Sequence, residues 1–233
     1  MNAFTLVRSL RVVCSGLLLA LIGACSSLLP KPAPPPAFYA LDGAGMLARS
    51  PERDTASASA RDTAAATAPR PAPTLIVNPP HAAAGFDSAR IIYTRQPHQL
   101  EHFARSEWID TPARMLAPLI VAAIERGGAF AAVVQTPSAA VGDIRLDTEM
   151  LRLQQDFAGS GSRVRFTLRA TLVDHATRRV LASREFDESA AAATDDPYGG
   201  VVAANRAVQS ALQSLAAFCG DAAARWQPPA ARR

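Results

Sequence analysis

The chain has 233 residues, of which 49% are hydrophobic, enough apolar side chains to bury the core of one domain. The formal net charge is +4, and Arg8 and Arg11 supply two of these charges, so the rest of the chain is nearer +2. No cluster of Lys and Arg dominates a region, which argues against nucleic acid as a partner.

The first 24 residues have the layout of a secretory signal peptide. Met1–Arg11 carries two arginines and no acidic residue, and Val12–Ile22 is apolar. A transmembrane helix needs about 20 apolar residues, whereas this run is shorter and leads into serines and a proline cluster. We therefore predict that residues 1–24 are a targeting segment and not a membrane span.

A cysteine stands at the predicted cleavage point. The segment Ile22–Cys25 resembles a bacterial lipobox, whose cysteine receives a diacylglyceryl thioether and becomes an acylated N-terminus. Two or more acyl chains give a durable anchor, so we predict that Cys25 is lipidated and holds the mature chain on a membrane. The alternative is a plain secreted protein with a chance cysteine. Ser26 stands where lipoproteins of the inner membrane typically carry Asp, which favours the outer membrane and a periplasm-facing protein.

We predict no disulfide bond between the other two cysteines, Cys14 and Cys219. Cys14 leaves with the signal peptide, so Cys219 is the only thiol left once Cys25 is acylated. Cys219 falls on the apolar face of a predicted helix, where a buried, small hydrophobic side chain is the favoured interpretation.

Two segments of biased composition precede the predicted domain. Residues 25–37 comprise the lipidated cysteine and a Pro-rich tether, an extended spacer of about 3.1 Å per residue. Residues 38–42 contain Phe38–Leu41, a candidate first strand. Residues 43–73 are mostly Ala, Ser, Thr, Arg, Asp and Pro, which cannot bury enough apolar area to offset the entropy of ordering. We predict a disordered insert there.

The domain itself is predicted to span residues 74–226, with a tail at 227–233. Short apolar runs predict strands at Leu75–Val77 and Ala89–Thr94, and a further extended segment at Phe103–Ile109.

A helix is predicted to begin at Thr111-Pro112, an N-cap residue followed by Pro at the first helical position. Apolar residues then recur at spacings of three and four up to Ile124, and Gly127-Gly128 end the pattern. Pro118 lies inside it and predicts a kink or two short helices.

A short strand is predicted at Ala131–Gln135, and three longer strands follow. Polar and apolar residues alternate from Asp143 to Met150 and from Arg163 to Leu172, with a slip of phase at Met150-Leu151 that predicts a bulge. With Val180–Phe186, these segments form a predicted antiparallel meander that has one apolar and one solvated face.

The solvated face of this meander carries charges of both signs. Opposite charges on neighbouring strands stabilise a sheet modestly, so a solvated ladder of ion pairs is favoured over an anion-binding site. Its members are Asp147, Glu149, Arg163, Arg165, Arg169, Glu185 and Asp187.

A long final helix is predicted from about Pro197 to Trp226, after Asp195 and Asp196, whose charges suit a helix start. Packed beside the first helix, it would cover the apolar face of the sheet. The sequence therefore predicts an α+β fold, with an antiparallel sheet and two main helices on one face, in two layers.

This order of features resembles the ABC-type transport auxiliary lipoproteins, the PqiC-like lipoproteins that accompany MCE-type lipid transport systems. The resemblance implies a non-catalytic, periplasm-facing accessory that contacts an MCE-family protein and needs no cofactor; a homo-oligomer is left open. The insert at 43–73 departs from the family pattern and leaves the pairing of the first strand open. Besides the lipobox and the proline spacer, the resemblance rests on Phe38–Leu41, Leu75–Val77, Ile91–Tyr93, Trp108, Leu116, Leu119, Gly127, Phe130, the long hairpin and the final helix.

The sequence contains no Gly-rich phosphate loop, no Gly-x-Ser-x-Gly elbow and no Cys/His metal spacing, so we do not expect an enzyme or a metal site. His98 and His102 would share a face with Glu101 only in a helix, and a polar surface turn is favoured. Tyr93 and Trp108 are candidates for a partner or ligand surface, with burial in the core as the favoured alternative.

Two other functions remain open. A periplasmic lipid-binding carrier would need an open apolar cavity between the sheet and the helices. A hydrolase, the less favoured of the two, would need a nucleophile near His98, His102 or His175.

Overall fold

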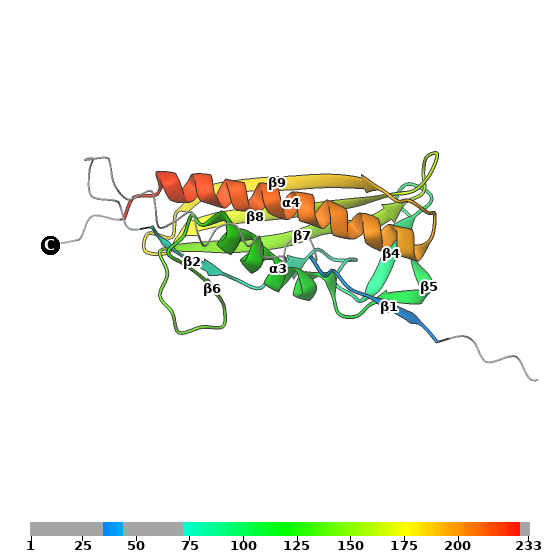
Figure 1. Cartoon of the computed structure of the whole chain (residues 1–233), viewed down its shortest axis with the longest axis horizontal. Helices are drawn as coiled ribbons and strands as arrows, with labels where there is room; N and C mark the ends of the chain where they lie inside the picture. The colour runs from blue at the N-terminus through cyan, green and yellow to red at the C-terminus, as the bar shows by residue number, and fades with distance from the viewer. Residues whose placement is uncertain (1–34, 44–71, 229–233) are drawn as a thin grey trace, which may run out of the picture. The chain divides into compact units, whose positions relative to one another are not determined.

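The computed structural model describes residues 35–43 and 72–228. The predicted signal peptide, Cys25, most of the predicted insert at 43–73 and the last residues of the predicted tail lie outside this part. The described residues from Pro36 onward belong to one unit, drawn in Figure 1.

Three long strands form the predicted antiparallel meander. β7 (Ile144–Asp156) pairs with β8 (Arg163–Asp174), and β8 pairs with β9 (Val180–Ala191). The register shifts between Met150 and Arg152, which confirms the bulge expected from the slip of phase. The alternation of polar and apolar residues thus gave both the strands and their irregularity.

On its other edge β7 has parallel neighbours. It pairs with β2 (Thr74–Val77), β3 (His81–Ala82) and β4 (Arg90–Thr94), and β2 pairs in turn with β6 (Ala132–Gln135), all in parallel. The nine strands of the described chain therefore form a mixed sheet, and the prediction of an antiparallel sheet is correct only for part of it. A short apolar run fits a strand of either direction, so its sequence does not specify the pairing.

The first strand closes one edge of the sheet. β5 (Glu101–Trp108) runs antiparallel to β4, and β1 (Ala37–Tyr39) pairs in parallel with β5, with Phe38 opposite Glu107. The pairing of the first strand, which the insert at 43–73 left open, is therefore with β5. The path across the sheet is β1-β5-β4-β7-β2-β6.

The first helix, α3 (Pro112–Gly127), begins and ends where the sequence predicts. Thr111 is its N-cap, and Gly128 follows it in the left-handed conformation with a φ of 65°. Pro118 lies within this one helix, so the prediction of two short helices is wrong. Pro118 is exposed, whereas Leu116 and Ile120 are fully buried, and this packing outweighs the backbone hydrogen bond that a proline removes.

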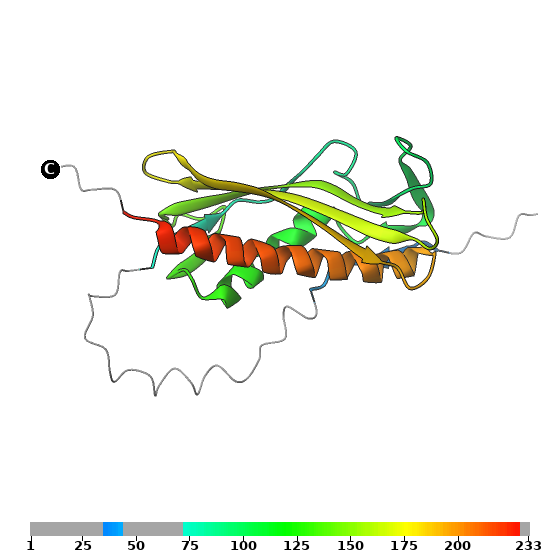
Figure 2. The ribbon, with the colours of Figure 1, turned by 90° about the horizontal axis from the view of Figure 1, so that it is seen from above.

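The second helix, α4 (Pro197–Arg225), is capped by Asp196, whose carboxylate accepts the N–H of Gly199 at 2.7 Å. α4 packs on β8, β9 and α3, and Figure 2 shows both helices on one face of the sheet. The core between the layers includes Phe166, Leu146, Leu168, Leu212 and Leu215, all without solvent exposure. This is the predicted α+β class, and neither helix of the described part is long and apolar enough to cross a bilayer.

Candidate functional site

Tyr93 and Trp108, the two aromatic residues singled out by the sequence, lie inside the fold. Only 7% of Tyr93 and 3% of Trp108 is exposed. The ring of Tyr93 packs 4.5 Å from that of Phe103, and its hydroxyl donates to Glu101 at 3.0 Å. The structure thus places both residues in the core, the alternative that the sequence favoured, and neither ring offers a broad surface to a partner.

On the charged face of the meander, arginines of β8 form ion pairs with carboxylates of the neighbouring strands. The guanidinium of Arg165 donates to both carboxylate oxygens of Asp187, and these hydrogen bonds hold the pKa of Asp187 below its usual value. Arg169 lies between Glu149 at 3.2 Å and Glu185 at 3.3 Å. Arg165 and Arg169 are thus paired with carboxylates, which leaves these two guanidinium groups little to offer an anion.

Two members of the predicted ladder bond outside it. Arg163 donates from Nε to the hydroxyl of Ser189 at 2.8 Å. Asp147 accepts from Arg145 and from the side-chain amide of Asn78. These contacts also saturate polar groups on the sheet, so the interpretation as a solvated structural face stands.

We expect the substitution Arg165→Ala to cost less than about 1 kcal/mol of the free energy of unfolding. Both partners of the Arg165–Asp187 pair are two-fifths exposed or more, and exposed ion pairs contribute little in water. Urea denaturation at low and at high salt measures the effect, which should shrink as salt screens the pair. A loss of several kcal/mol would show instead that the ladder holds the meander together.

An open cavity of about 400 Å³ lies where the β8–β9 turn meets the end of α4. We call it the turn cavity. Its volume falls within the range of ligand and peptide pockets, about 300–1,000 Å³. Its lining includes Asp174, Arg179, Val180, Leu181, Arg225 and Trp226.

Asp174 is a buried carboxylate among the residues that line the turn cavity. It is 5% exposed, accepts the indole N–H of Trp226 at 2.9 Å and accepts both the N–H and the hydroxyl of Thr177 at 2.7 Å. Burial raises the pKa of this carboxyl, but the hydrogen bonds from Thr177, Trp226 and Ala176 outweigh burial and bring the pKa below its usual value. The ionised carboxylate therefore joins the turn to the end of α4.

The rim of the turn cavity combines positive charge with apolar surface. Arg179 and Arg225 are exposed and form no ion pair within the described residues. Val180 is 63% exposed, and Leu181 beside it is 39% exposed. Such a rim suits a partner that brings carboxylates together with apolar side chains.

Sequence reasoning missed the turn cavity. The one local signal was the step from two arginines to Val180-Leu181 at the start of a strand. Nothing in the sequence showed that Arg225 and Trp226, at the far end of a different element, meet this turn.

We expect Trp226→Phe to destabilise the protein in a pH-dependent way. The folded-state pKa of Asp174 is lowered, so its ionisation stabilises the fold above the unfolded-state pKa of about 3.9 and ceases to do so as the pH falls through the folded-state pKa. Loss of the indole donor should cost about 1–3 kcal/mol at pH 7 and less near pH 3. Urea denaturation at both pH values measures this difference.

The matched control for this prediction is the same substitution in an Asp174→Asn background, where its cost should no longer depend on pH. A cost that is equal at both pH values in the native background would show that the ring packs against the turn without supporting the charge of Asp174.

The histidines form no metal or catalytic cluster in the part of the chain that the structure describes. His98 has a φ of 68° in the β4–β5 turn, and His102 lies in β5, so the two do not share a helical face. His175 is exposed in the β8–β9 turn. Among residues 35–43 and 72–228, no three His, Cys, Asp or Glu side chains come together to hold a metal.

The interior of the domain is filled. Cys219 is fully buried, and burial raises the pKa of its thiol to about 12, which confirms its role as a small hydrophobic residue. The cavity between the sheet and α4, lined by Trp108 and Gly200 among others, has a volume of about 10 Å³. A larger cavity of about 370 Å³ between α3 and α4, beside Ala123 and Gly220, is open to solvent.

A family model described as ABC-type transport auxiliary lipoprotein component matches residues 56–217 of the chain. The crystal structure of protein XCC0632 from Xanthomonas campestris is similar, with a TM-score of 0.61 and 26% identity, over 66% of this chain and 87% of that one. Another crystal structure, described only as an uncharacterized protein, shares the fold with a TM-score of 0.57 and 12% identity, over 80% of this chain and 99% of that one. No curated protein matches the chain.

Proposed function

Because the chain belongs to the ABC-type transport auxiliary lipoprotein component family, we propose that it is a non-catalytic subunit of an ABC/MCE-type envelope lipid transport system. In this role acylated Cys25 anchors the protein in the outer membrane, where it faces the periplasm. Residues 25–37 tether the domain at 74–226, and the domain docks onto an MCE-family protein.

The turn cavity carries the docking part of this proposal. It presents exposed Val180 and Leu181 together with two guanidinium groups that form no ion pair within residues 35–43 and 72–228. Arg is enriched where proteins bind one another, and the buried centre of an interface is more apolar than its rim. In the charge ladder, by contrast, Arg165 and Arg169 are already paired with carboxylates, and Tyr93 and Trp108 are buried.

The alternative function, a lipid-binding carrier, has less support from the packing of the domain. A carrier needs an enclosed cavity that can take an acyl chain, whereas the space between the sheet and α4 is about 10 Å³ and the cavity of about 370 Å³ between α3 and α4 is open to solvent. Native mass spectrometry of the purified lipoprotein decides between the two. Bound lipid in a fixed ratio, beyond the acyl chains on Cys25, would favour the carrier.

A hydrolase is the third candidate function, and the positions of the histidines argue against it. His98, His102 and His175 are exposed, and within the described residues none is part of a cluster of metal-ligating side chains. We expect replacement of all three by Gln to leave envelope lipid transport unchanged, and loss of transport would reopen this function.

Affinity purification from detergent-solubilised envelopes tests the docking proposal. The lipidated full-length chain should recover an MCE-family protein, identified by mass spectrometry. The double substitution Arg179→Glu/Arg225→Glu should reduce this recovery, and the matched double substitution Arg105→Glu/Arg163→Glu, at exposed arginines away from the turn cavity, should not. Recovery of unrelated envelope proteins alone would contradict the proposal.

A further inference from the structure

Four apolar or aromatic side chains surround the strand by which the chain enters the domain. Phe38 is 56% exposed, and Ile109 and Tyr198 are each 64% exposed. Tyr39 joins them, because its ring lies 6.5 Å from that of Tyr198 and its carbonyl accepts the N–H of Ile109 at 2.7 Å. We call this group the entry patch.

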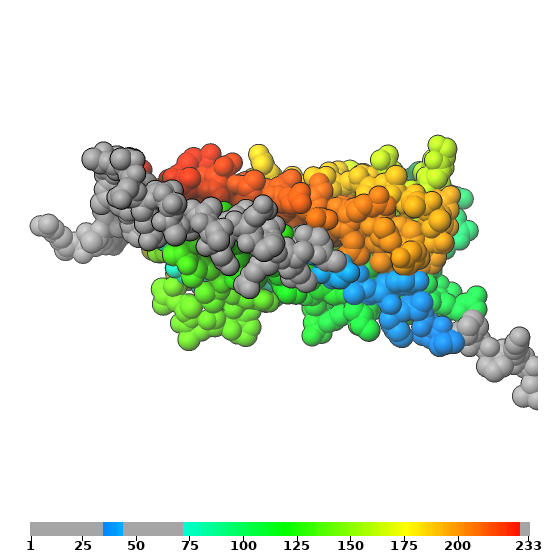
Figure 3. Space-filling view, viewed as in Figure 1, coloured from blue at the N-terminus to red at the C-terminus, as the bar shows by residue number. Residues whose placement is uncertain are grey.

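The entry patch wraps around a free edge of the sheet. β1 is the last strand of the path, and within the described residues its outer edge pairs with no strand. Figure 3 shows β1 at the surface beside the first turns of α4. Asn205 of α4 bonds to Ala40 and Asp42, directly after β1, so the patch is held firmly on the domain.

A phospholipid headgroup layer can accommodate both the free backbone groups of β1 and the aromatic side chains beside them. The unpaired backbone groups of β1 need polar partners, which water and headgroups supply and hydrocarbon does not. Aromatic side chains, meanwhile, gain by resting among the headgroups at the edge of the acyl region. We propose that the entry patch rests on the headgroup surface of the membrane that anchors the chain.

The short length of chain between Cys25 and β1 favours the membrane surface as the partner of the entry patch. Only residues 26–35 separate Cys25 from Pro36, and at about 3.5 Å per residue they span about 35 Å at full extension. The inference rests on the acylation of Cys25 in the proposed function. Given that anchor, the patch meets the membrane in an intramolecular step, and a weak intrinsic affinity is sufficient.

The charges around the patch predict which lipids it accepts. Glu107 lies opposite Phe38, and Asp110 follows Ile109 and pairs with Arg114 at 3.3 Å. The patch therefore has no excess of positive charge, and we expect it to rest on neutral phospholipids as well as on anionic ones.

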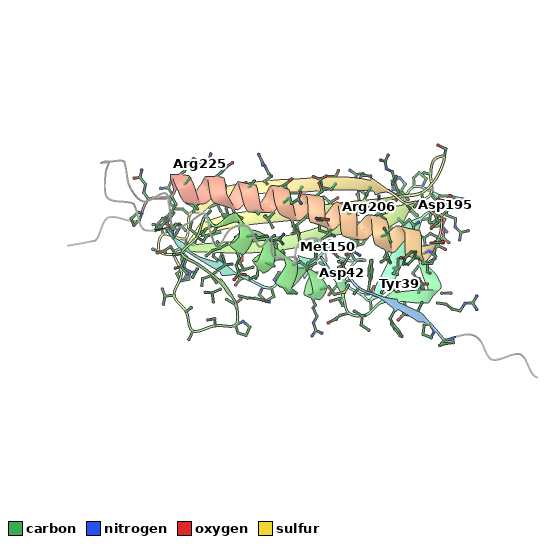
Figure 4. All side chains as sticks on the ribbon, in the orientation of Figure 1. Tyr39, Asp42, Met150, Asp195, Arg206 and Arg225 are labelled. Carbon is green, nitrogen blue, oxygen red and sulfur yellow. The ribbon has the colours of Figure 1, made fainter. Side chains whose placement is uncertain are left out.

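Resting on this patch would orient the whole domain. Figure 4 places Tyr39 and Arg225 at opposite ends of α4, which is about 43 Å long from its 29 residues. With the entry patch on the membrane, the turn cavity lies at the end away from it. The partner would then be met in the periplasm rather than at the lipid surface.

A fluorophore on a single thiol tests the contact. Acylation occupies Cys25 and burial protects Cys219, so Ile109→Cys provides one reactive site in the lipidated full-length chain. In phosphatidylcholine vesicles that contain doxyl-labelled lipid, we expect the label at position 109 to be quenched several-fold more than a label on Val141→Cys. Val141 is 85% exposed and lies outside the patch. The added substitutions Phe38→Ser/Tyr198→Ser should bring quenching down to the Val141→Cys level, while the protein still floats with the vesicles.

Three results would overturn the inference, and they are distinguishable. Equal quenching at positions 109 and 141, in a chain that floats, removes the patch contact and leaves the anchor. A blue-shifted label that lipid does not quench means that protein, such as a second copy, covers the patch. A chain that does not float at all contradicts the lipid anchor, and the patch contact falls with it.

Discussion

Replacement of Cys25 by Ser is expected to move the protein from the membrane pellet to the supernatant after ultracentrifugation of broken cells. The substitution removes the thioether and with it every acyl chain, and durable anchoring needs two such membrane signals. The entry patch cannot compensate, because without the tether its contact with the membrane is no longer intramolecular. Immunoblotting of the two fractions measures the shift, which should be close to complete.

The matched control is Cys14→Ser, a change of the same kind inside the predicted signal peptide, which should leave the protein in the pellet. Retention of the Cys25→Ser protein in salt-washed membranes would show that something other than acylation holds it there.

Phe166→Ala is expected to lower the free energy of unfolding by about 3–5 kcal/mol. Phe166 has no solvent exposure and lies in β8, the strand between β7 and β9, under α4. The free energy of unfolding of such a domain is about 5–15 kcal/mol, so the variant would be only marginally stable. Urea denaturation should show a lower midpoint with an unchanged m-value.

Val141→Ala is the control for this substitution, because Val141 is almost fully exposed and should change stability by no more than about 0.5 kcal/mol. A cost below about 1 kcal/mol for Phe166→Ala would mean that the sheet and α4 are packed less tightly than the structure shows.

The elements with a clear period were predictable from the sequence. Alternation gave β7 and β8 together with the bulge after Met150, because a strand with one buried face repeats every two residues. Spacings of three and four gave both helices, together with Thr111 as a cap and the charges of Asp195 and Asp196 at the start of the second. Strand direction was not predictable, since the short apolar strands β2 and β4 are compatible with parallel and antiparallel neighbours alike.

The candidate site was less predictable than the fold. The turn cavity needs Asp174 of the β8–β9 turn and Trp226 of α4, which a hydrogen bond joins across the fold. Local patterns do not encode such a meeting of distant elements. Tyr93 and Trp108 stood out as aromatic landmarks, and their burial shows that a landmark in sequence can serve packing rather than recognition.

The features of the domain fit a component that holds other proteins in place at the membrane. One end carries the chain entry and the entry patch, and the other end carries the turn cavity (Figure 4). In the proposed arrangement, the lipid anchor brings the first end to the membrane and the second end reaches the transporter. The protein would then contribute attachment and orientation, and the transport step itself would belong to its partners.

Site-specific photo-crosslinking in cells tests this arrangement most directly. A photoreactive amino acid at position 180, on the rim of the turn cavity, should form a crosslink to an MCE-family protein, and the same amino acid at position 38, in the entry patch, should not. A crosslink to that protein from position 38 and none from position 180 would reverse the proposed orientation. If neither position gives such a crosslink, while position 180 captures other proteins, the docking of this domain onto an MCE-family protein is contradicted.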